Sequence, residues 1–222
     1  MAGKRDDIVN KPDPFRVFFE RVIRYFTVNI MQAYALLGVI ALLFVGSAGW
    51  YLYSANYENS ARILYDKALT ASITGTMDRK AILKVYQDVV GEYPRSKAAV
   101  IASYLIGNLY YNLNDIDAAI KSYKEFLKRA PSDNTLTAFV YSGLGYCYEA
   151  KKDYKNALSA YEDALKNTGS SQFAVMNYRN AARICESLNN PAKALEYYKK
   201  ALMNNTDPAL DILIKKKMST LG

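Results

Sequence analysis

The first apolar block of the chain runs from Ile30 to Tyr53 and contains no charged residue. A helix of this length spans about 36 Å at ~1.5 Å per residue, which exceeds the roughly 30 Å hydrocarbon core of a bilayer. Trp50, Tyr51 and Tyr53 gather at its C-terminal end, where aromatic rings favour the headgroup layer. The pattern predicts a single transmembrane helix over residues 30–53.

The charges that flank this block predict its orientation. The basic residues that precede it are Lys4, Arg5, Lys11, Arg16, Arg21 and Arg24. Residues 54–57 carry no charge, and the next charged residues are Glu58 and Arg62. Since basic flanking segments stay in the cytoplasm, we expect residues 1–29 to be cytoplasmic and residues 54–222 to lie across the membrane. In a bacterium, the span would then lie in the inner membrane and residues 54–222 in the periplasm. A signal peptide cleaved near residues 46–48 is the alternative, although the charged leader is long for one.

Apolar residues at helical spacing also occur before the span. They are Phe15, Phe18, Phe19, Val22, Ile23 and Phe26. Asp13 and Pro14 supply an N-cap and a first helical residue. We predict an amphipathic helix that lies on anionic cytoplasmic headgroups. Docking of a cytoplasmic protein is the alternative.

Beyond residue 54, aromatic and small residues recur every 37 or 38 positions. The aromatic positions are Tyr86, Tyr123, Tyr161 and Tyr198, and the residues four places earlier are Ile82, Ala119, Ala157 and Ala194. Gly107 and Gly145 lie sixteen residues before the second and third of these tyrosines. Repetition at a fixed period indicates stacked supersecondary units.

Turn residues divide each repeat into two helices. Asn- and Asp-rich stretches fall at 112–115, 151–154 and 188–191, and Pro94 and Pro131 end the second helix of their units. We predict an all-α fold of antiparallel helix pairs. The expected units are about 63–96, 100–133, 138–171 and 175–208, followed by an amphipathic capping helix at 208–221.

This pattern resembles the tetratricopeptide repeat. The matching residues are Gly107, Tyr110, Ala119, Tyr123 and Pro131; Tyr141, Leu144, Gly145, Tyr148, Ala157, Tyr161 and Ala164; and Tyr178, Ala182, Ala194, Tyr198 and Ala201. The resemblance implies a right-handed α-solenoid. The family period is about 34, so we place the extra residues between units. The first unit is degenerate, with Thr70 and Ile82 at the small-residue positions.

The whole layout is similar to a second group of proteins. Its short motifs are Gly49-Trp50, Ser60-Ala61-Arg62 and Pro208-Ala209-Leu210, beside one early span and degenerate repeats. The group is the single-pass inner-membrane tetratricopeptide proteins that are ancillary subunits of the Sec translocon. The resemblance implies a role beside protein export, with translocon subunits, exported polypeptides or periplasmic chaperones as partners.

The first helices of the units are expected to line a concave protein-binding face. The candidate binding residues are Tyr104, Asn108, Tyr111, Phe139, Tyr146, Arg179 and Arg183. Tyrosine offers a large contact area with a polar tip, and two arginines one turn apart fit a carboxylate. The alternatives are inter-helix packing for the tyrosines, and pairing of the arginines with Glu149 or Glu186 on a solvated face.

Composition narrows the function classes. The chain has no His and two Cys, which removes imidazole catalysis, imidazole metal ligands and a four-thiolate zinc site. We therefore predict no enzyme, no catalytic or metal site, no cofactor and no small-molecule substrate. The net charge of +8 is spread along helices, so nucleic acid is not expected either. Cys147 and Cys185 are expected as buried apolar residues rather than a disulfide.

The expected function is a membrane-anchored periplasmic protein-binding module that assists protein export. A structural scaffold for envelope assembly or cell division is the alternative, and an accessory to a respiratory or polysaccharide-synthesis enzyme is a third.

Overall fold

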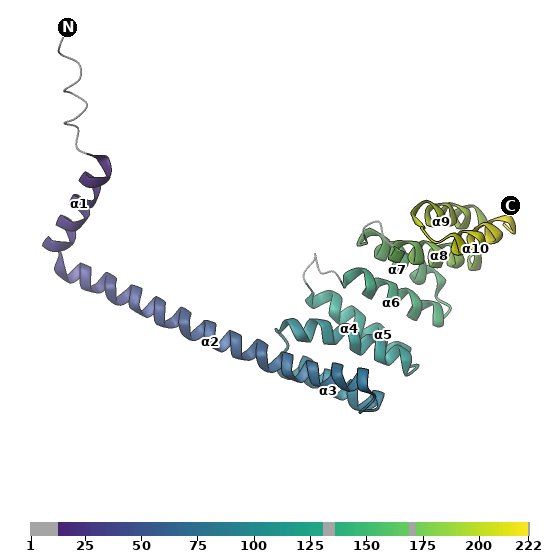
Figure 1. The fold of residues 1–222 in the computed structure, drawn as a ribbon, viewed down its shortest axis with the longest axis horizontal. Coiled ribbons are helices and arrows are strands. Elements are labelled where there is room, and N and C mark those ends of the chain that lie inside the picture. The colour runs from purple at the N-terminus through teal and green to yellow at the C-terminus, as the bar shows by residue number, and fades with distance from the viewer. Residues whose placement is uncertain (1–12, 131–135, 169–171, 222) are drawn as a thin grey trace, which may run out of the picture. The chain divides into compact units, whose positions relative to one another are not determined.

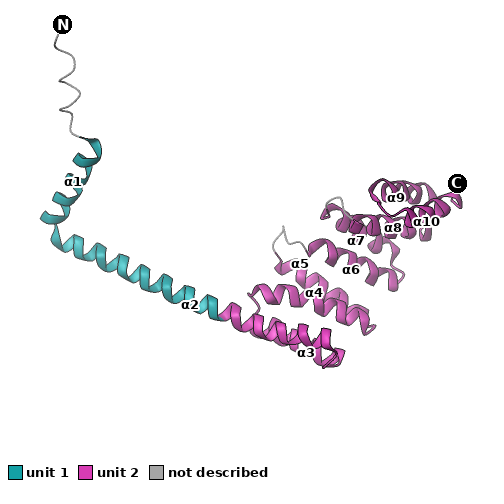
Figure 2. Cartoon of the chain, in the orientation of Figure 1, with its two compact units in different colours: residues 1–56 teal, residues 57–222 magenta. Residues whose placement is uncertain are grey.

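The computed structural model describes residues 13–130, 136–168 and 172–221 (Figure 1). Every regular element within these ranges is an α-helix, which confirms the all-α prediction. The chain divides into two compact units, Met1–Asn56 and Tyr57–Gly222 (Figure 2). Lys4, Arg5, Lys11 and Pro131, used in the sequence argument, lie outside the described residues.

The N-terminal unit begins with helix α1 (Pro14–Val28). The Asp13 side chain accepts a hydrogen bond from the Phe15 N–H at 2.9 Å, and Pro14 occupies the first turn, as predicted. The side chains of Phe15, Phe18 and Ile23 are exposed. One residue, Asn29, separates α1 from the next helix.

Helix α2 (Ile30–Thr74) carries the apolar block and continues past it. Among the described residues it is the helix that is long and apolar enough to cross a membrane, by length and composition, and none of its apolar window is buried. The predicted span, residues 30–53, and the start of the first predicted unit near residue 63 both fall within this one helix, whose unbroken course was not predicted. Residues 54–62 contain no Gly or Pro, so nothing in them interrupts a helix.

The second unit is a series of antiparallel helix hairpins. Its helices after the C-terminal part of α2 are α3 (Arg79–Glu92), α4 (Lys97–Asn112), α5 (Ile116–Arg129), α6 (Thr137–Ala150), α7 (Tyr154–Lys166), α8 (Gln172–Ser187), α9 (Pro191–Asn204) and α10 (Pro208–Ser219). In each hairpin, α4–α5, α6–α7 and α8–α9, the two helices pack along their length (Figure 1). The segments between hairpins are longer than the turns within them, as the repeat interval predicts.

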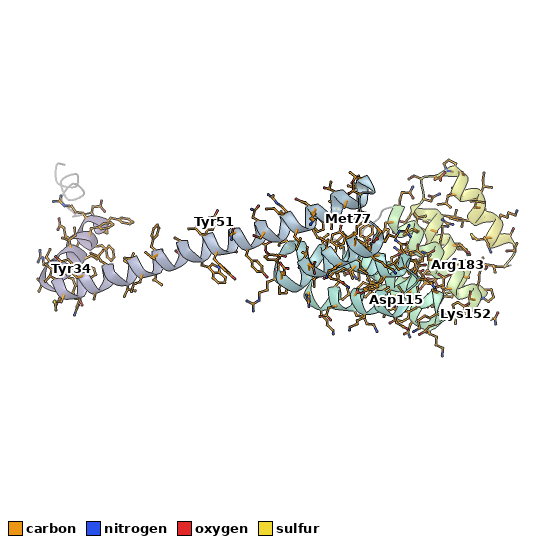
Figure 3. The ribbon with its side chains drawn as sticks, turned by 90° about the horizontal axis from the view of Figure 1, so that it is seen from below. Tyr34, Tyr51, Met77, Asp115, Lys152 and Arg183 are labelled. Carbon is orange, nitrogen blue, oxygen red and sulfur yellow. The ribbon has the colours of Figure 1, made fainter. Side chains whose placement is uncertain are left out.

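The turns within the hairpins share one geometry. Asn114, Lys152 and Asn189 adopt positive φ angles of 62°, 59° and 55°. The next residue in each turn caps the following helix, and Asp115 accepts a hydrogen bond from the Ala118 N–H at 3.1 Å. Asp115 and Lys152 lie at such hairpin ends (Figure 3). The Asn- and Asp-rich turns are therefore located where the sequence predicts them.

Glycine and tyrosine form the contact inside two of the hairpins, α4–α5 and α6–α7. A Cβ atom added to Gly145 on α6 would lie 2.5 Å from Cε1 of Tyr161 on α7, and Gly107 and Tyr123 are related in the same way. Both tyrosines are buried. Gly143 extends the pattern, because its added Cβ would lie 2.7 Å from Cζ of Tyr123 on the preceding hairpin. The ring of Tyr123 thus fills a space between two glycine-bearing helices.

The remaining core consists largely of alanine and small apolar residues. Cys147 and Cys185 are free and buried in different clusters of the core, as predicted. Burial raises the pKa of the Cys147 thiol to about 12. Helix α10 closes the array by burying Ile214 among residues of α8 and α9, with Leu210 and Met218 beside it.

Candidate functional site

A hollow of about 230 Å³ lies across helices α4, α6 and α8. We call it the aromatic groove, and its lining residues are Tyr104, Asn108, Tyr111, Tyr123, Phe139, Ser142, Gly143, Tyr146, Phe173 and Met176. Five of the predicted binding residues come together here. They are Tyr104, Asn108, Tyr111, Phe139 and Tyr146.

Helical spacing brings these side chains to one face. Tyr104, Asn108 and Tyr111 follow one another at intervals of four and three residues on α4. Phe139 and Tyr146 are two turns apart on α6. Because the hairpins repeat with the same geometry, the corresponding faces of α4, α6 and α8 join into one surface.

Aromatic contacts run along the groove between neighbouring units. The rings of Phe139 on α6 and Phe173 on α8 have centroids 4.2 Å apart, and those of Tyr111 and Tyr146 are 6.5 Å apart. The Phe139 side chain is nevertheless exposed. Exposed aromatic rings in a concave site provide apolar contact area with little loss of side-chain entropy on binding.

The polar groups of the groove are held by hydrogen bonds. The Tyr123 hydroxyl donates to Asn108 Oδ1 at 2.6 Å, and the Ser142 hydroxyl donates to Asn177 Oδ1 at 2.8 Å. Burial raises the pKa of the Tyr111 phenol, with nearby Cys147 and Glu149 adding to the rise. Tyr111 therefore carries a neutral hydroxyl at the edge of the groove.

A second hollow of about 410 Å³ lies between α8, α9 and the capping helix α10. We call it the basic cleft, and its lining residues are Arg179, Asn180, Arg183, Tyr198, Leu213, Ile214, Lys216, Lys217 and Thr220. It contains the other two predicted residues, Arg179 and Arg183. The Asn180 amide joins the two hollows, since its Nδ2 donates to the Tyr146 hydroxyl at 2.9 Å.

Arg183 is already occupied by an acid of its own chain. Its guanidinium forms a two-point ion pair with Glu149 of α6, with Nη2 2.9 Å from Oε2. The hydrogen bond to Glu149 raises the pKa of Arg183. Of the two roles left open by the sequence, the structure shows the pairing with Glu149. Binding of a carboxylate by Arg179 and Arg183 together stays a prediction.

The residues that α9 and α10 contribute to the basic cleft were not predicted from the sequence. Tyr198, Leu213 and Lys216 face the same hollow as Arg179, but they come from helices assigned to packing and capping. The repeat register relates positions that recur from unit to unit, and α10 lies outside the repeat, so the register carries no signal for a site completed by this helix. Phe173 was missed for a simpler reason: it lies six residues before Arg179, the first predicted binding residue on α8.

Comparison with known proteins identifies the repeats. A family profile described as tetratricopeptide repeat matches residues 97–170, and a second profile with the same description matches residues 153–209. Together they cover about half of the chain. The chain is a tetratricopeptide-repeat protein. Such repeats are protein-interaction modules, generally without catalytic activity of their own.

Solved structures share the fold. MamA has a TM-score of 0.55 with 21% identity over 65% of this chain and 72% of that one. A MamA fragment from Desulfovibrio magneticus RS-1 has a TM-score of 0.55 with 18% identity over 66% of this chain and 76% of that one. No curated protein matches the sequence. These likenesses concern the arrangement of helices alone.

The chemistry of both hollows is that of recognition. In the described part of the chain, no three acidic, Cys or His side chains gather where they could hold a metal ion. The groove offers aromatic faces, hydroxyls and amides, and the cleft offers cations. Such groups bind peptides by contact, hydrogen bonding and charge.

Proposed function

We propose that this protein is a membrane-anchored module that binds extended or helical peptide segments in the aromatic groove, as an accessory to protein export. The observation that carries the proposal is the meeting of Tyr104, Tyr111, Phe139 and Tyr146 in one hollow formed by three successive units. Their rings are supplied by a repeat fold whose general task is protein binding.

Membrane anchorage is the second part of the proposal. The proposal that the apolar part of α2 crosses the membrane is supported by the length and composition of this helix and by the exposure of its side chains. The basic residues before it favour a cytoplasmic N-terminus and a periplasmic repeat unit. The partners proposed from the resemblance to translocon-associated proteins are translocon subunits, exported polypeptides and periplasmic chaperones.

Photo-crosslinking in living bacteria tests the binding role. A benzophenone amino acid replaces Phe139 or Tyr111, which are exposed in the groove, and Met203, exposed on α9 outside both hollows, serves as the matched control. We expect translocon subunits or newly exported chains to crosslink at the groove positions and not at Met203. Recovery of envelope-assembly or division proteins instead would favour the scaffold alternative.

Topology is tested separately with reporter fusions. Alkaline phosphatase, which is active only in the periplasm, is fused to the C-terminus, and a fluorescent protein that fails to mature there is fused in parallel. Phosphatase activity without fluorescence is expected. The opposite pattern would place the repeats in the cytoplasm and remove export as their task, while leaving peptide binding in the groove open to the crosslinking test.

A further inference from the structure

The basic cleft contains more positive charge than its own acids neutralise. Arg183 pairs with Glu149, and Lys217 Nζ lies 3.4 Å from Oε2 of Glu186, which also accepts a hydrogen bond from the Tyr198 hydroxyl. Arg179 and Lys216 line the same cleft, and neither forms an ion pair with any described residue. Two cations from two different helices are thus left facing one hollow.

The wall beside these cations is apolar. Ile214 of α10 is buried, whereas Leu213 on the same helix is 59% exposed and lines the cleft. The Tyr198 ring completes the wall, with its hydroxyl held by Glu186. Burial and the hydrogen bond to Glu186 raise the pKa of Tyr198, and the charges of Arg179 and Arg183 offset part of this rise.

We propose that the basic cleft binds a carboxylate of a peptide whose neighbouring residue is apolar, with Arg179 of α8 and Lys216 of α10 holding the carboxylate and Leu213 contacting the apolar side chain. This inference rests on the proposed function and specifies its ligand. A peptide is the occupant because the cleft meets the aromatic groove at the Asn180–Tyr146 hydrogen bond, so one bound segment can reach both hollows.

A carboxylate fits this charge pattern better than a phosphate does. A guanidinium and an ammonium group balance one or two negative charges, and Arg presents paired N–H donors to a carboxylate. Glu149 and Glu186 pair with the other two cations, Arg183 and Lys217, and their negative charge would repel a more highly charged anion. The exposed leucine beside the cations has no role in binding a small inorganic anion.

The test uses the full chain in detergent micelles and three short fluorescent peptides of one Phe- and Leu-containing sequence. The first peptide is uncharged and amidated, the second has a free C-terminal carboxylate, and the third is amidated with one internal Asp. Fluorescence anisotropy measures Kd for each. We expect one or both acidic peptides to bind about tenfold tighter than the uncharged one, as charge-assisted hydrogen bonds typically allow. The tighter of the two acidic peptides identifies the source of the carboxylate.

Three variants locate the effect. Arg179→Gln and Lys216→Gln each remove one free cation of the cleft. Lys215→Gln makes the same charge change one residue away on α10, at an exposed position that does not line the cleft. The first two variants are expected to remove most of the preference for the acidic peptide, and Lys215→Gln to retain it. Binding of the uncharged peptide in every variant shows that the groove remains folded.

The outcomes separate the two proposals. If the acidic and uncharged peptides bind the unaltered chain equally well, or if Lys215→Gln weakens the preference as much as Lys216→Gln, the carboxylate site is wrong and the groove proposal stands. If none of the three peptides binds, the groove proposal fails with it. If inorganic phosphate competes with the acidic peptide at concentrations where acetate does not, the cleft is a phosphate site and the assignment is overturned.

Discussion

At the scale of single residues, the α4–α5 and α6–α7 hairpins each contain a tyrosine whose ring occupies the space beside a glycine. The phenol ring of Tyr161 is buried against Gly145, and its hydroxyl reaches Glu149 Oε2 at 3.3 Å. The ring therefore fixes the distance between α6 and α7, while the hydroxyl orients the acid that pairs with Arg183. Packing inside one unit and charge pairing with the next are joined through one side chain.

Replacing Gly145 by Ala is expected to destabilise the protein by about 1–3 kcal/mol, since the added methyl group forces Tyr161 or its helix to shift. Urea unfolding followed by circular dichroism measures the change. Gly91→Ala is the matched control, because Gly91 lies on α3 with no atom within 4 Å of an added Cβ. That variant is expected to gain roughly 0.5–1 kcal/mol from helix propensity. Equal effects of the two substitutions would contradict the packing argument.

Lys152 is the one lysine among three left-handed turn positions that Asn otherwise occupies. Asn tolerates this conformation better than residues with longer side chains do, so Lys152→Asn is expected to stabilise the protein by about 0.5–1 kcal/mol. The urea midpoint measures the gain. Lys155→Asn, at an exposed position within α7, is expected to lower stability slightly because Asn is a weaker helix former. A lower midpoint for Lys152→Asn would show that its side chain has a role beyond the turn.

At the scale of helices, ion pairs connect successive hairpins from α5 to α9. Lys151 contacts Asp117 at 2.5 Å, Arg183 contacts Glu149, and Lys193 contacts Glu162 at 2.8 Å. Each pair joins one hairpin to its neighbour. The paired residues are 34, 34 and 31 residues apart, less than the repeat interval, so each pair joins different positions of successive units that stacking brings together.

Helix α10 is expected to stabilise the last hairpin through Ile214. Ile214→Ala removes a buried side chain that packs on α8 and α9, and a loss of about 2–4 kcal/mol is expected. Hydrogen exchange measures local protection, which should fall in α9 first. Ile212→Ala changes a side chain that is 68% exposed on the same helix and should alter stability by less than about 0.5 kcal/mol. Unchanged protection of α9 in Ile214→Ala would mean that α10 does not cap the array.

Glu162 on α7 makes the link to α9 sensitive to acid. Burial alone would raise the pKa of Glu162, but hydrogen bonds from Lys193 and Tyr197 outweigh burial and hold this pKa below the usual value for a glutamate. A group with a lowered pKa in the folded state contributes stability above its unfolded pKa and loses it as the pH falls through the folded pKa.

Stability is therefore expected to decline as the pH falls below about 4.5, and Glu162→Gln to decline less by up to about 1 kcal/mol. Thermal unfolding between pH 3 and pH 7 measures both proteins. Glu92→Gln, exposed at the end of α3, is the control and should follow the unaltered chain. Parallel curves for Glu162→Gln and the unaltered protein would show that this link does not depend on the charge of Glu162.

At the scale of the whole molecule, the repeat register was predictable because its signals are local and recur. Tyr123, Tyr161 and Tyr198, the small residues before them and the Asn- and Asp-rich turns fall where hairpin geometry requires them. The aromatic groove followed from the same register. The unbroken continuation of α2 beyond Tyr53 was not predicted, because the Ser, Ala and Asn that follow the apolar segment neither stop a helix nor mark where it continues.

The basic cleft was the least predictable part of the candidate site. The sequence indicates that Arg179 and Arg183 share a face, but it does not indicate which acid reaches either of them. Glu149 lies 34 residues before Arg183 and meets it only because the two hairpins stack in register. Lys216 and Leu213 enter the cleft through the docking of α10, which depends on tertiary packing.

Contacts between neighbouring units also bear on how such a chain evolves. The Ser142–Asn177, Tyr146–Asn180 and Glu149–Arg183 links join α6 to the helix of the following hairpin and to no more distant one. Duplication of one whole hairpin in the gene would thus be accommodated without redesign of the others. It would lengthen the spacing between aromatic and acidic anchors on a bound segment, and so change which clients the protein accepts.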